Sequence, residues 1–319
     1  MAGDRDVNIV VYAHLEARHL EQIRAVDPRV RVTLVTDQPQ GTDGVRTAEI
    51  MVGWNIPREA VQRASGLKWI HSTAAGVDQL LYPEIRERGI ILTASMGIHH
   101  QLVEHIFAFL LALERRLHVA MRLQLQRKWD RTHTVGDELA GKTLGILGLG
   151  TIGQQLVRKA QAFDMRVIGT KRTPTPLPGV DRVLPPDGLP QVLRESDAVV
   201  VALPLTPQTR GLIGERELQM MKPTAWFINV GRGPIVHEAA VIQALRAGRI
   251  AGAALDVFEH EPLRSDSPLY ELENVILTPH VSGASPRYMD RAVPLFCENL
   301  ARYLRGAPLR NLVDPERGY

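Results

Sequence analysis

Thr143 to Gly153 read TLGILGLGTIG, and this stretch decides the fold. Its first five residues, 143–147, form an apolar run that suits a buried strand. A helical pattern follows at Gln154–Phe163, and a second apolar strand is expected at Arg166–Gly169. A GxGxxG motif between a strand and a helix, with another strand behind it, is the context that a dinucleotide-binding unit requires.

Each glycine of this motif has a physical role in such a unit. Gly148 permits the tight turn, Gly150 leaves room where the backbone approaches a pyrophosphate, and Gly153 lets helix and strand pack closely. The helix N-terminus then offers free N–H groups and the positive end of the helix dipole, which favour phosphate, and Thr151 and Ile152 of the motif are expected cofactor contacts. We therefore expect a nucleotide at these residues; the alternative is a glycine-rich turn of an ordinary α/β sheet.

The composition excludes several classes of protein. The 319 residues carry a formal net charge of only +3, without a Lys/Arg block interleaved with aromatics, so we expect no nucleic-acid partner. The chain has no apolar run of about 18 residues and no signal-peptide pattern at its N-terminus, so we expect no membrane association. One cysteine, Cys297, excludes an internal disulfide and indicates a cytoplasmic protein.

Strand and helix patterns alternate along the chain, which predicts parallel sheets with helices on both faces. Before the glycine motif we expect a helix at Leu15–Val26 and strands at Val7–Tyr12, Val30–Val35, Ile50–Gly53, Trp69–Ser72 and Ile90–Thr93. After it we expect strands at Ala198–Leu203, Ala225–Val230, Ile250–Phe258 and Val275–Leu277. The Pro-rich stretch Thr173–Pro190 is expected to be an irregular surface loop.

Two helices define the expected domains. A long apolar helix, predicted at His100–Val119, starts a new region, and the last helix, predicted at Arg287–Arg305, can pack back on the N-terminal domain. We therefore expect an α/β fold of two Rossmann-like domains with parallel sheets, the N-terminal one discontinuous. Residues 1–97 plus 287–319 would form the substrate-binding domain, and residues 98–286 the dinucleotide-binding domain.

Polar side chains follow three of the later strands. Arg232 lies between two glycines, where its fork can hold a carboxylate, although a solvated surface Arg is the commoner case. Glu261 and His280 also follow strands of the same expected sheet, so the three can converge at one edge. Asp256 lies at the end of an apolar run, where burial is costly unless the carboxylate has a partner.

Two loops and one helix offer further candidates. The small residues of Ser72–Asp78 can expose N–H groups to an anion, or form a plain turn with Asp78 as helix cap. The loop Pro204–Thr209 can wall a nucleotide pocket, or be a structural turn. His100, Glu104 and His105 have the spacing H-x-x-x-E-H, which matches no zinc motif, so we expect no metal.

Taken together, these motifs resemble the D-isomer-specific 2-hydroxyacid dehydrogenase family. The resemblance covers nearly the whole chain and is densest from Gly97 to Gly283. It is carried by GLGTIG at 148–153, LTPQT at 205–209, MKP at 221–223, NVGRG at 229–233, ALDVF at 254–258, Glu261-Pro262 and TPH at 278–280.

The resemblance implies an NAD(P)-dependent enzyme that interconverts small 2-keto acids and D-2-hydroxy acids, of the glyoxylate or hydroxypyruvate reductase kind, and a homodimer formed mainly through the nucleotide domain. It implies catalytic roles for Arg232, Glu261 and His280. It implies the substrate-carboxylate loop Ala75-Gly76-Val77, with Arg232 as a further substrate contact. Further cofactor contacts expected on this basis are Leu203, Pro204, Thr209, Val230, Gly231, Arg232, Asp256, His280 and Gly283.

One departure from the family pattern concerns the cofactor. Members that use NAD usually carry an acid at the end of the second strand of the nucleotide unit, where this chain has Lys171 and Arg172. Two cations there suit the 2′-phosphate of NADP(H), although they can also be the solvated end of a surface loop. We therefore expect NADP to be preferred, with NAD possible. The alternative functions are a non-catalytic nucleotide-sensing corepressor and a formate-type dehydrogenase.

Overall fold

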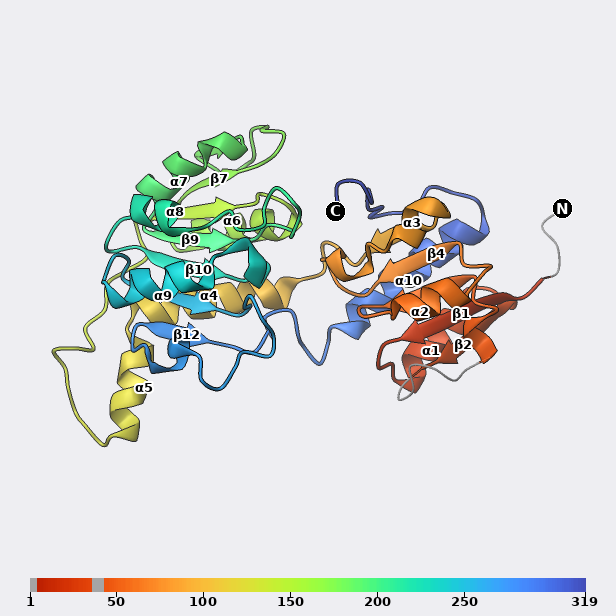
Figure 1. Cartoon of the computed structure of the whole chain (residues 1–319), viewed down its shortest axis with the longest axis horizontal. Coiled ribbons are helices and arrows are strands. Elements are labelled where there is room, and N and C mark those ends of the chain that lie inside the picture. Colours follow the sequence, from red (N-terminus) through yellow and green to blue (C-terminus); the bar gives the residue numbers. More distant parts are fainter. Residues whose placement is uncertain (1–4, 36–42) are drawn as a thin grey trace. The chain divides into compact units, whose positions relative to one another are not determined.

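A computed structural model of the chain describes residues 5–35 and 43–319. The remaining residues, 1–4 and 36–42, belong to the expected N-terminal domain and lie outside the described residues. The chain divides into two compact units, each an α/β structure around one sheet (Figure 1). Unit 1 comprises Met1–Ile98 with Ser285–Tyr319, and unit 2 comprises His99–Ala284. Each pair of neighbouring strands that the described residues form in the two sheets is parallel, which confirms the expected fold class.

Unit 1 is a sheet of order β2-β1-β3-β4-β5. Its strands are β1 (Val7–Tyr12), β2 (Val30–Leu34), β3 (Ile50–Gly53), β4 (Trp69–Ser72) and β5 (Ile91–Ala94). Its helices are α1 (Ala17–Arg24), α2 (Arg58–Arg63), α3 (Pro83–Glu87) and α10 (Met289–Leu304). One apolar cluster joins the sheet to α2 and α3, and a second joins it to α1 and α10, so helices cover both faces. The C-terminal helix thus completes the N-terminal core.

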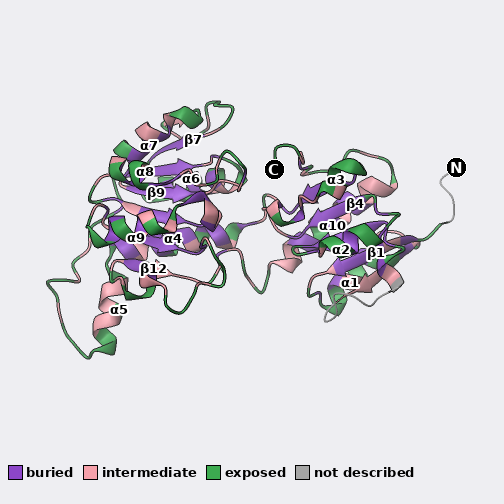
Figure 2. Ribbon diagram, in the orientation of Figure 1, coloured by how far each residue is buried: buried purple, intermediate pink, exposed green. Residues whose placement is uncertain are grey.

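Unit 2 is a larger sheet of order β12-β11-β10-β9-β6-β7-β8. Its strands are β6 (Thr143–Leu147), β7 (Arg166–Thr170), β8 (Arg182–Leu184), β9 (Ala198–Val201), β10 (Trp226–Asn229), β11 (Gly252–Leu255) and β12 (Val275–Leu277). Its helices are α4 (His100–Glu114), α5 (Leu117–Leu125), α6 (Thr151–Ala162), α7 (Leu189–Glu195), α8 (Glu215–Met220) and α9 (Glu238–Arg246). The central strands are buried on both faces, as the purple ribbons of Figure 2 show.

Short 3₁₀ turns lie at Asp43–Val45, Asp78–Leu80, Pro186–Gly188, Gly233–Ile235 and Pro268–Glu271. Cys297 is a free, half-buried thiol on α10, and its burial raises the pKa to about 11. Across the described residues, no helix is long and apolar enough to cross a membrane.

The expected single helix at His100–Val119 is wrong, because the chain breaks it after Glu114. Arg116 adopts a left-handed backbone with φ of 52°, and α5 starts one residue later. The carbonyl oxygen of Glu114 accepts a hydrogen bond from the Asp137 N–H at 2.9 Å. Its carboxylate is buried and accepts hydrogen bonds from Trp226 Nε1 and Lys142 Nζ. These long-range partners fix the helix end and are invisible to local periodicity.

The expectation for Thr173–Pro190 is wrong in part. Residues Arg182–Leu184 form the edge strand β8, which pairs in parallel with β7. The Leu184 carbonyl also accepts the Lys171 N–H at 2.8 Å. Proline is excluded from a sheet because it lacks an N–H, but the three residues of this strand contain none. The prolines on either side therefore restrict the length of this strand but do not prevent it from forming.

Candidate active site

The sheet topology of unit 2 brings the predicted catalytic residues to one edge. Strands β10, β11 and β12 are neighbours, and Arg232, Glu261 and His280 each follow one of them. Parallel strands end at the same edge of a sheet, which is where open α/β folds bind ligands.

Glu261 and His280 form a hydrogen-bonded pair. Glu261 Oε2 lies 2.6 Å from His280 Nδ1, and Oε1 accepts the Phe258 N–H at 3.0 Å. The carboxylate is therefore fixed at both oxygens and holds a proton on Nδ1. Nε2 is then the ring nitrogen that can exchange a proton with a ligand. The two side chains are 29% and 34% exposed, which leaves them accessible from one side.

Asp256 anchors the segment that carries His280. Its fully buried carboxylate accepts hydrogen bonds from the Thr278 hydroxyl at 2.5 Å, the Val281 N–H at 2.9 Å and the Ser282 N–H at 3.0 Å. Its carbonyl oxygen accepts the His280 N–H at 2.8 Å. The sequence analysis expected a buried Asp256 to need hydrogen-bond partners, and these three donors are the partners. The nicotinamide contact implied for Asp256 by resemblance stays a prediction.

His105 belongs to this anchor. Because the Thr278 hydroxyl gives its proton to Asp256, it can only accept from His105 Nε2, which lies 3.2 Å away. Burial lowers the pKa of His105, opposed by the charge of Asp256. Its helix neighbours His100 and Glu104 are exposed. Among the residues that the structure describes, no group of three His, Cys, Asp or Glu side chains could hold a metal ion.

Arg232 lies in a turn closed by Asn229, a buried residue whose structural role the sequence reasoning missed. Asn229 Oδ1 accepts the Gly231 N–H at 3.1 Å, and Nδ2 donates to the Arg232 carbonyl at 3.2 Å. The next residue, Gly233, touches the segment after β11: a Cβ there would lie 1.7 Å from the Phe258 carbonyl oxygen. Only glycine allows this approach, which brings the Arg232 turn against the chain leading to Glu261.

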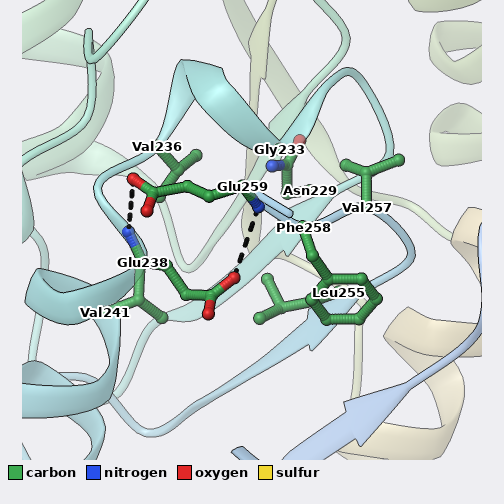
Figure 3. A pocket seen from close by; sticks show the side chains of 9 residues that line it. All are labelled: Asn229, Gly233, Val236, Glu238, Val241, Leu255, Val257, Phe258 and Glu259. Carbon is green, nitrogen blue, oxygen red and sulfur yellow. Dashed lines mark hydrogen bonds between the residues drawn. The ribbon is translucent and has the colours of Figure 1, made fainter. Parts of the chain in front are cut away.

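A pair of crossed hydrogen bonds secures the same contact (Figure 3). Glu259 Oε1 accepts the Glu238 N–H at 3.2 Å, and Glu238 Oε2 accepts the Glu259 N–H at 3.3 Å. Both residues line a small pocket between the Arg232 turn and the end of β11. Burial and the like charge of Glu259 raise the pKa of Glu238. Each carboxylate accepts a hydrogen bond from a backbone N–H. The sequence analysis assigned no role to either residue.

The glycine motif has the form a dinucleotide requires. Gly148 has φ of 104°, which favours glycine, and a Cβ at Gly153 would lie 2.4 Å from the Gly148 carbonyl oxygen. Gly150 is open, with no heavy atom within 4 Å of an added Cβ. Helix α6 begins at Thr151, and no hydrogen bond is formed within the described chain by the N–H groups of Gly150, Thr151 and Ile152. These donors fit a pyrophosphate.

The remaining predicted cofactor residues lie around the same sheet edge or on segments beside it. Lys171 follows β7, and its Nζ lies 3.5 Å from the carbonyl of Leu149 within the glycine motif, with Arg172 exposed beside it. Thr209 closes the loop after β9 by donating to the Pro204 carbonyl at 2.7 Å. The Gly283 carbonyl accepts a hydrogen bond from Gln101 Nε2 at 2.6 Å. The other predicted cofactor residues are Leu203, Val230 and Gly231.

The predicted substrate loop lies in unit 1, after β4. The carbonyl groups of residues 72–74, which precede the loop, all accept hydrogen bonds. Those of Ser72 and Ala74 accept the Ser95 N–H at 3.0 and 3.1 Å, and that of Thr73 accepts the Tyr288 hydroxyl at 2.5 Å. By contrast, the N–H groups of Ala75, Gly76 and Val77 donate no hydrogen bond to any of the described residues. Successive free N–H groups form an anion-binding concavity. The 3₁₀ turn that follows begins at Asp78, and its cap position is Val77.

A buried histidine below this loop was not recognised from the sequence. His71 is fully buried, with Nδ1 2.8 Å from Thr93 Oγ1 and Nε2 3.1 Å from Ser95 Oγ. Burial lowers its pKa to about 3. All four residues of β4 are buried, and the hydrogen-bond partners of His71 come from β5 and the residue after it.

The chain is similar in sequence and fold to several known proteins. Residues 107–282 match the model of the D-isomer specific 2-hydroxyacid dehydrogenase family, NAD binding domain. A glyoxylate reductase of Thermococcus litoralis is 35% identical over 305 residues, 93% of this chain and 86% of that protein. A D-isomer specific 2-hydroxyacid dehydrogenase of Xanthobacter autotrophicus Py2, crystallised with NADPH and MES, aligns with a TM-score of 0.88 at 33% identity, over 98% of this chain and 100% of that one.

A second solved structure is an NADPH-dependent glyoxylate/hydroxypyruvate reductase of Sinorhizobium meliloti, in complex with NADP and sulfate. It aligns with a TM-score of 0.86 at 29% identity, over 98% of this chain and 100% of that chain.

The buried His71 predicts an acid-sensitive stability. Its pKa is about 3 in the folded protein, against an ordinary value of 6.5, so the unfolded chain binds the proton first. The stabilisation is complete above about pH 6.5 and is lost as pH falls toward 3. From pH 7 to 5, the unfolding free energy should fall about 2 kcal/mol more in the wild type than in His71→Gln. Urea titrations at both pH values measure this, and equal falls would contradict it.

Proposed function

The chain belongs to the D-isomer specific 2-hydroxyacid dehydrogenase family, and we propose that it reduces a small 2-keto acid of the glyoxylate or hydroxypyruvate type with NADPH. The product is the D-2-hydroxy acid. The observation that supports this most strongly is the Glu261–His280 pair, 2.6 Å apart, at the edge of the sheet that also carries the glycine motif. NADPH supplies the hydride that reduces the ketone.

His280 is proposed to supply the proton. Negative charge grows on the ketone oxygen as the carbon is reduced, and an imidazolium can neutralise it near neutral pH. Glu261 holds Nδ1, so the proton that is transferred is the one on Nε2. In the oxidative direction the neutral imidazole accepts the proton of the hydroxyl group through the same atom.

Arg232 and the loop Ala75–Val77 are proposed to hold the substrate. A guanidinium binds a carboxylate through two parallel hydrogen bonds, and it can also polarise the neighbouring ketone oxygen. The free N–H groups of Ala75, Gly76 and Val77 also suit a carboxylate.

For the cofactor, we propose a binding surface that starts at the open N-terminus of α6. The N–H groups at Gly150–Ile152 would hold the pyrophosphate, with Gly148 and Gly153 shaping the turn. Lys171 lies beside this turn, and with Arg172 it would bind the 2′-phosphate. The others proposed are Leu203, Pro204, Thr209, Val230, Gly231, Asp256 and Gly283.

We also propose a homodimer formed through unit 2. Leu117, Met121 and Leu125 are 50%, 65% and 86% exposed and form an apolar stripe at four-residue spacing along α5. Trp129, four residues after the end of the helix, is 92% exposed. A second copy of the chain would cover the stripe, since a monomer has little reason to expose so many apolar side chains together. The free thiol of Cys297 supports a cytoplasmic location.

A change at His280 tests the proposed activity. His280→Ala should reduce glyoxylate turnover by about 10²- to 10⁴-fold, because general acid catalysis contributes that much. NADPH binding should remain near the wild-type value. Oxidation of NADPH followed by absorbance gives the rate, and fluorescence titration gives the affinity. A variant that keeps more than half of the wild-type turnover would remove His280 from the mechanism.

The cofactor preference is tested at Lys171 and Arg172. NADPH should be used at least about tenfold better than NADH in kcat/KM, a difference of about 1.4 kcal/mol. Lys171→Asp with Arg172→Ala should reduce or reverse the ratio, because it removes two cations and introduces an acid near the ribose. Both cofactors are measured at one ionic strength, since salt screens exposed charges. Equal use of NADH by the unmodified enzyme would refute the preference.

The apolar stripe of α5 is tested by charge insertion. Met121→Glu with Leu125→Glu should convert the dimer into monomer, because two carboxylates would be buried at the interface. Gln126→Glu adds a charge at the C-cap of the same helix, outside the stripe, and should leave the dimer intact. Light scattering after size-exclusion chromatography measures the mass. A wild-type monomer, or a dimer in the double variant, would exclude this interface.

A further inference from the structure

We infer that His71 is a positioning residue, which acts with Thr93 and Ser95 to hold the loop Ala75–Val77 in the form that binds the substrate carboxylate. This inference rests on the proposed function, in which that loop contacts the substrate. The three residues come from β4, β5 and the residue that follows β5, and all are fully buried in unit 1.

The direction of each hydrogen bond follows from the number of protons available. The Ser95 hydroxyl donates to the Ser72 carbonyl at 3.0 Å, so it must accept from His71 Nε2. His71 Nδ1 then carries no proton and accepts from the Thr93 hydroxyl. Thr93 in turn accepts from Trp69 Nε1 at 2.8 Å. This single chain of donors runs from Trp69 to the Ser72 carbonyl and satisfies every side-chain group in it.

The far end of the chain is the segment that precedes the substrate loop. Ser95 holds the Ser72 carbonyl through its hydroxyl and its N–H. The same N–H also reaches the Ala74 carbonyl, and Ser72 Oγ donates to that oxygen at 3.1 Å. The carbonyl groups of Ser72 and Ala74 are thus turned into the protein. Because the carbonyl orientations at 72–74 constrain the following peptide planes, the N–H groups at 75–77 remain available to an anion.

Packing leaves His71 little alternative position. Its ring lies 6.1 Å from that of Trp69 and 5.3 Å from that of Phe296 on α10, measured between ring centres. An apolar side chain in its place would remove the acceptor for the Thr93 proton and the donor to Ser95 Oγ, leaving Thr93 only Trp69 and Ser95 only the Ser72 carbonyl. A buried polar group that loses a partner costs free energy, which favours its displacement toward a new one. Ser95 is hydrogen-bonded to the carbonyl groups of Ser72 and Ala74, so a displacement of Ser95 would also move the backbone of the loop.

His71→Leu is the direct test, with Asn299→Ala as the matched control. Asn299 is also fully buried in unit 1 and forms two hydrogen bonds, to the backbone of Arg310, but it has no contact with the loop. His71→Leu should raise the KM for glyoxylate at least about tenfold and leave the KM for NADPH within about twofold. Asn299→Ala should change neither constant by more than about twofold. His71→Gln, which keeps polar groups in the site, should lie between wild type and His71→Leu.

Hydrogen exchange on the free enzyme supplies a readout that does not depend on activity. In His71→Leu the amides of Thr73, Ala74 and Ser95, each hydrogen-bonded in the wild type, should lose protection, whereas those of β1 should not. If His71→Leu does not fold, Ser95→Ala takes its place with the same expectations.

Two outcomes would overturn the inference: an unchanged KM for glyoxylate, or an equal rise of that KM in Asn299→Ala. If the wild type reduces no 2-keto acid, the proposed function fails, and exchange alone decides: unchanged protection at Thr73, Ala74 and Ser95 overturns the inference, and selective loss there supports it.

Discussion

The buried carboxylate of Asp256 is the interaction on which the candidate site of unit 2 depends. It accepts three hydrogen bonds from the segment that carries His280, and that segment has no regular secondary structure of its own. Removing this acceptor would take a partner from two N–H groups and a hydroxyl. The Ser282 N–H is buried, where an unsatisfied donor typically costs about 1–3 kcal/mol. His280 adopts a left-handed backbone with φ of 54°, and these bonds hold it there.

Each unit has its own sheet, and the carboxyl ends of the strands carry different groups in the two sheets. In unit 2 the strand ends present charged side chains, and close backbone contact at Gly233 and the Glu238–Glu259 bonds hold their segments together. In unit 1 the strand end presents backbone N–H groups, and a buried chain of hydrogen bonds through His71 holds the loop. In both cases buried polar groups are fully satisfied, which makes the arrangement rigid.

The sequence predicted most of the fold because the strands of both sheets are apolar runs bounded by glycine, proline and polar residues. The fold class and the family are confirmed, and the Glu261–His280 contact follows from the rule that parallel strands end at one edge. The break at Arg116 and the strand at Arg182–Leu184 were not predicted, because partners distant in sequence produce them. The functions of Asp256, Asn229 and His71 as anchors were missed for the same reason. The roles of Arg232, Lys171 and the loop Ala75–Val77 toward ligands stay predictions.

The central claim is that the Glu261–His280 pair delivers the proton when the keto acid is reduced. The most direct measurement is the single-turnover rate of NADPH oxidation by glyoxylate in Glu261→Gln, compared with the wild type at one pH. The substitution keeps an oxygen that can accept a hydrogen bond, but it removes the negative charge beside the imidazole ring. The account predicts a rate lower by at least about tenfold, with NADPH affinity unchanged. A rate equal to that of the wild type would contradict it.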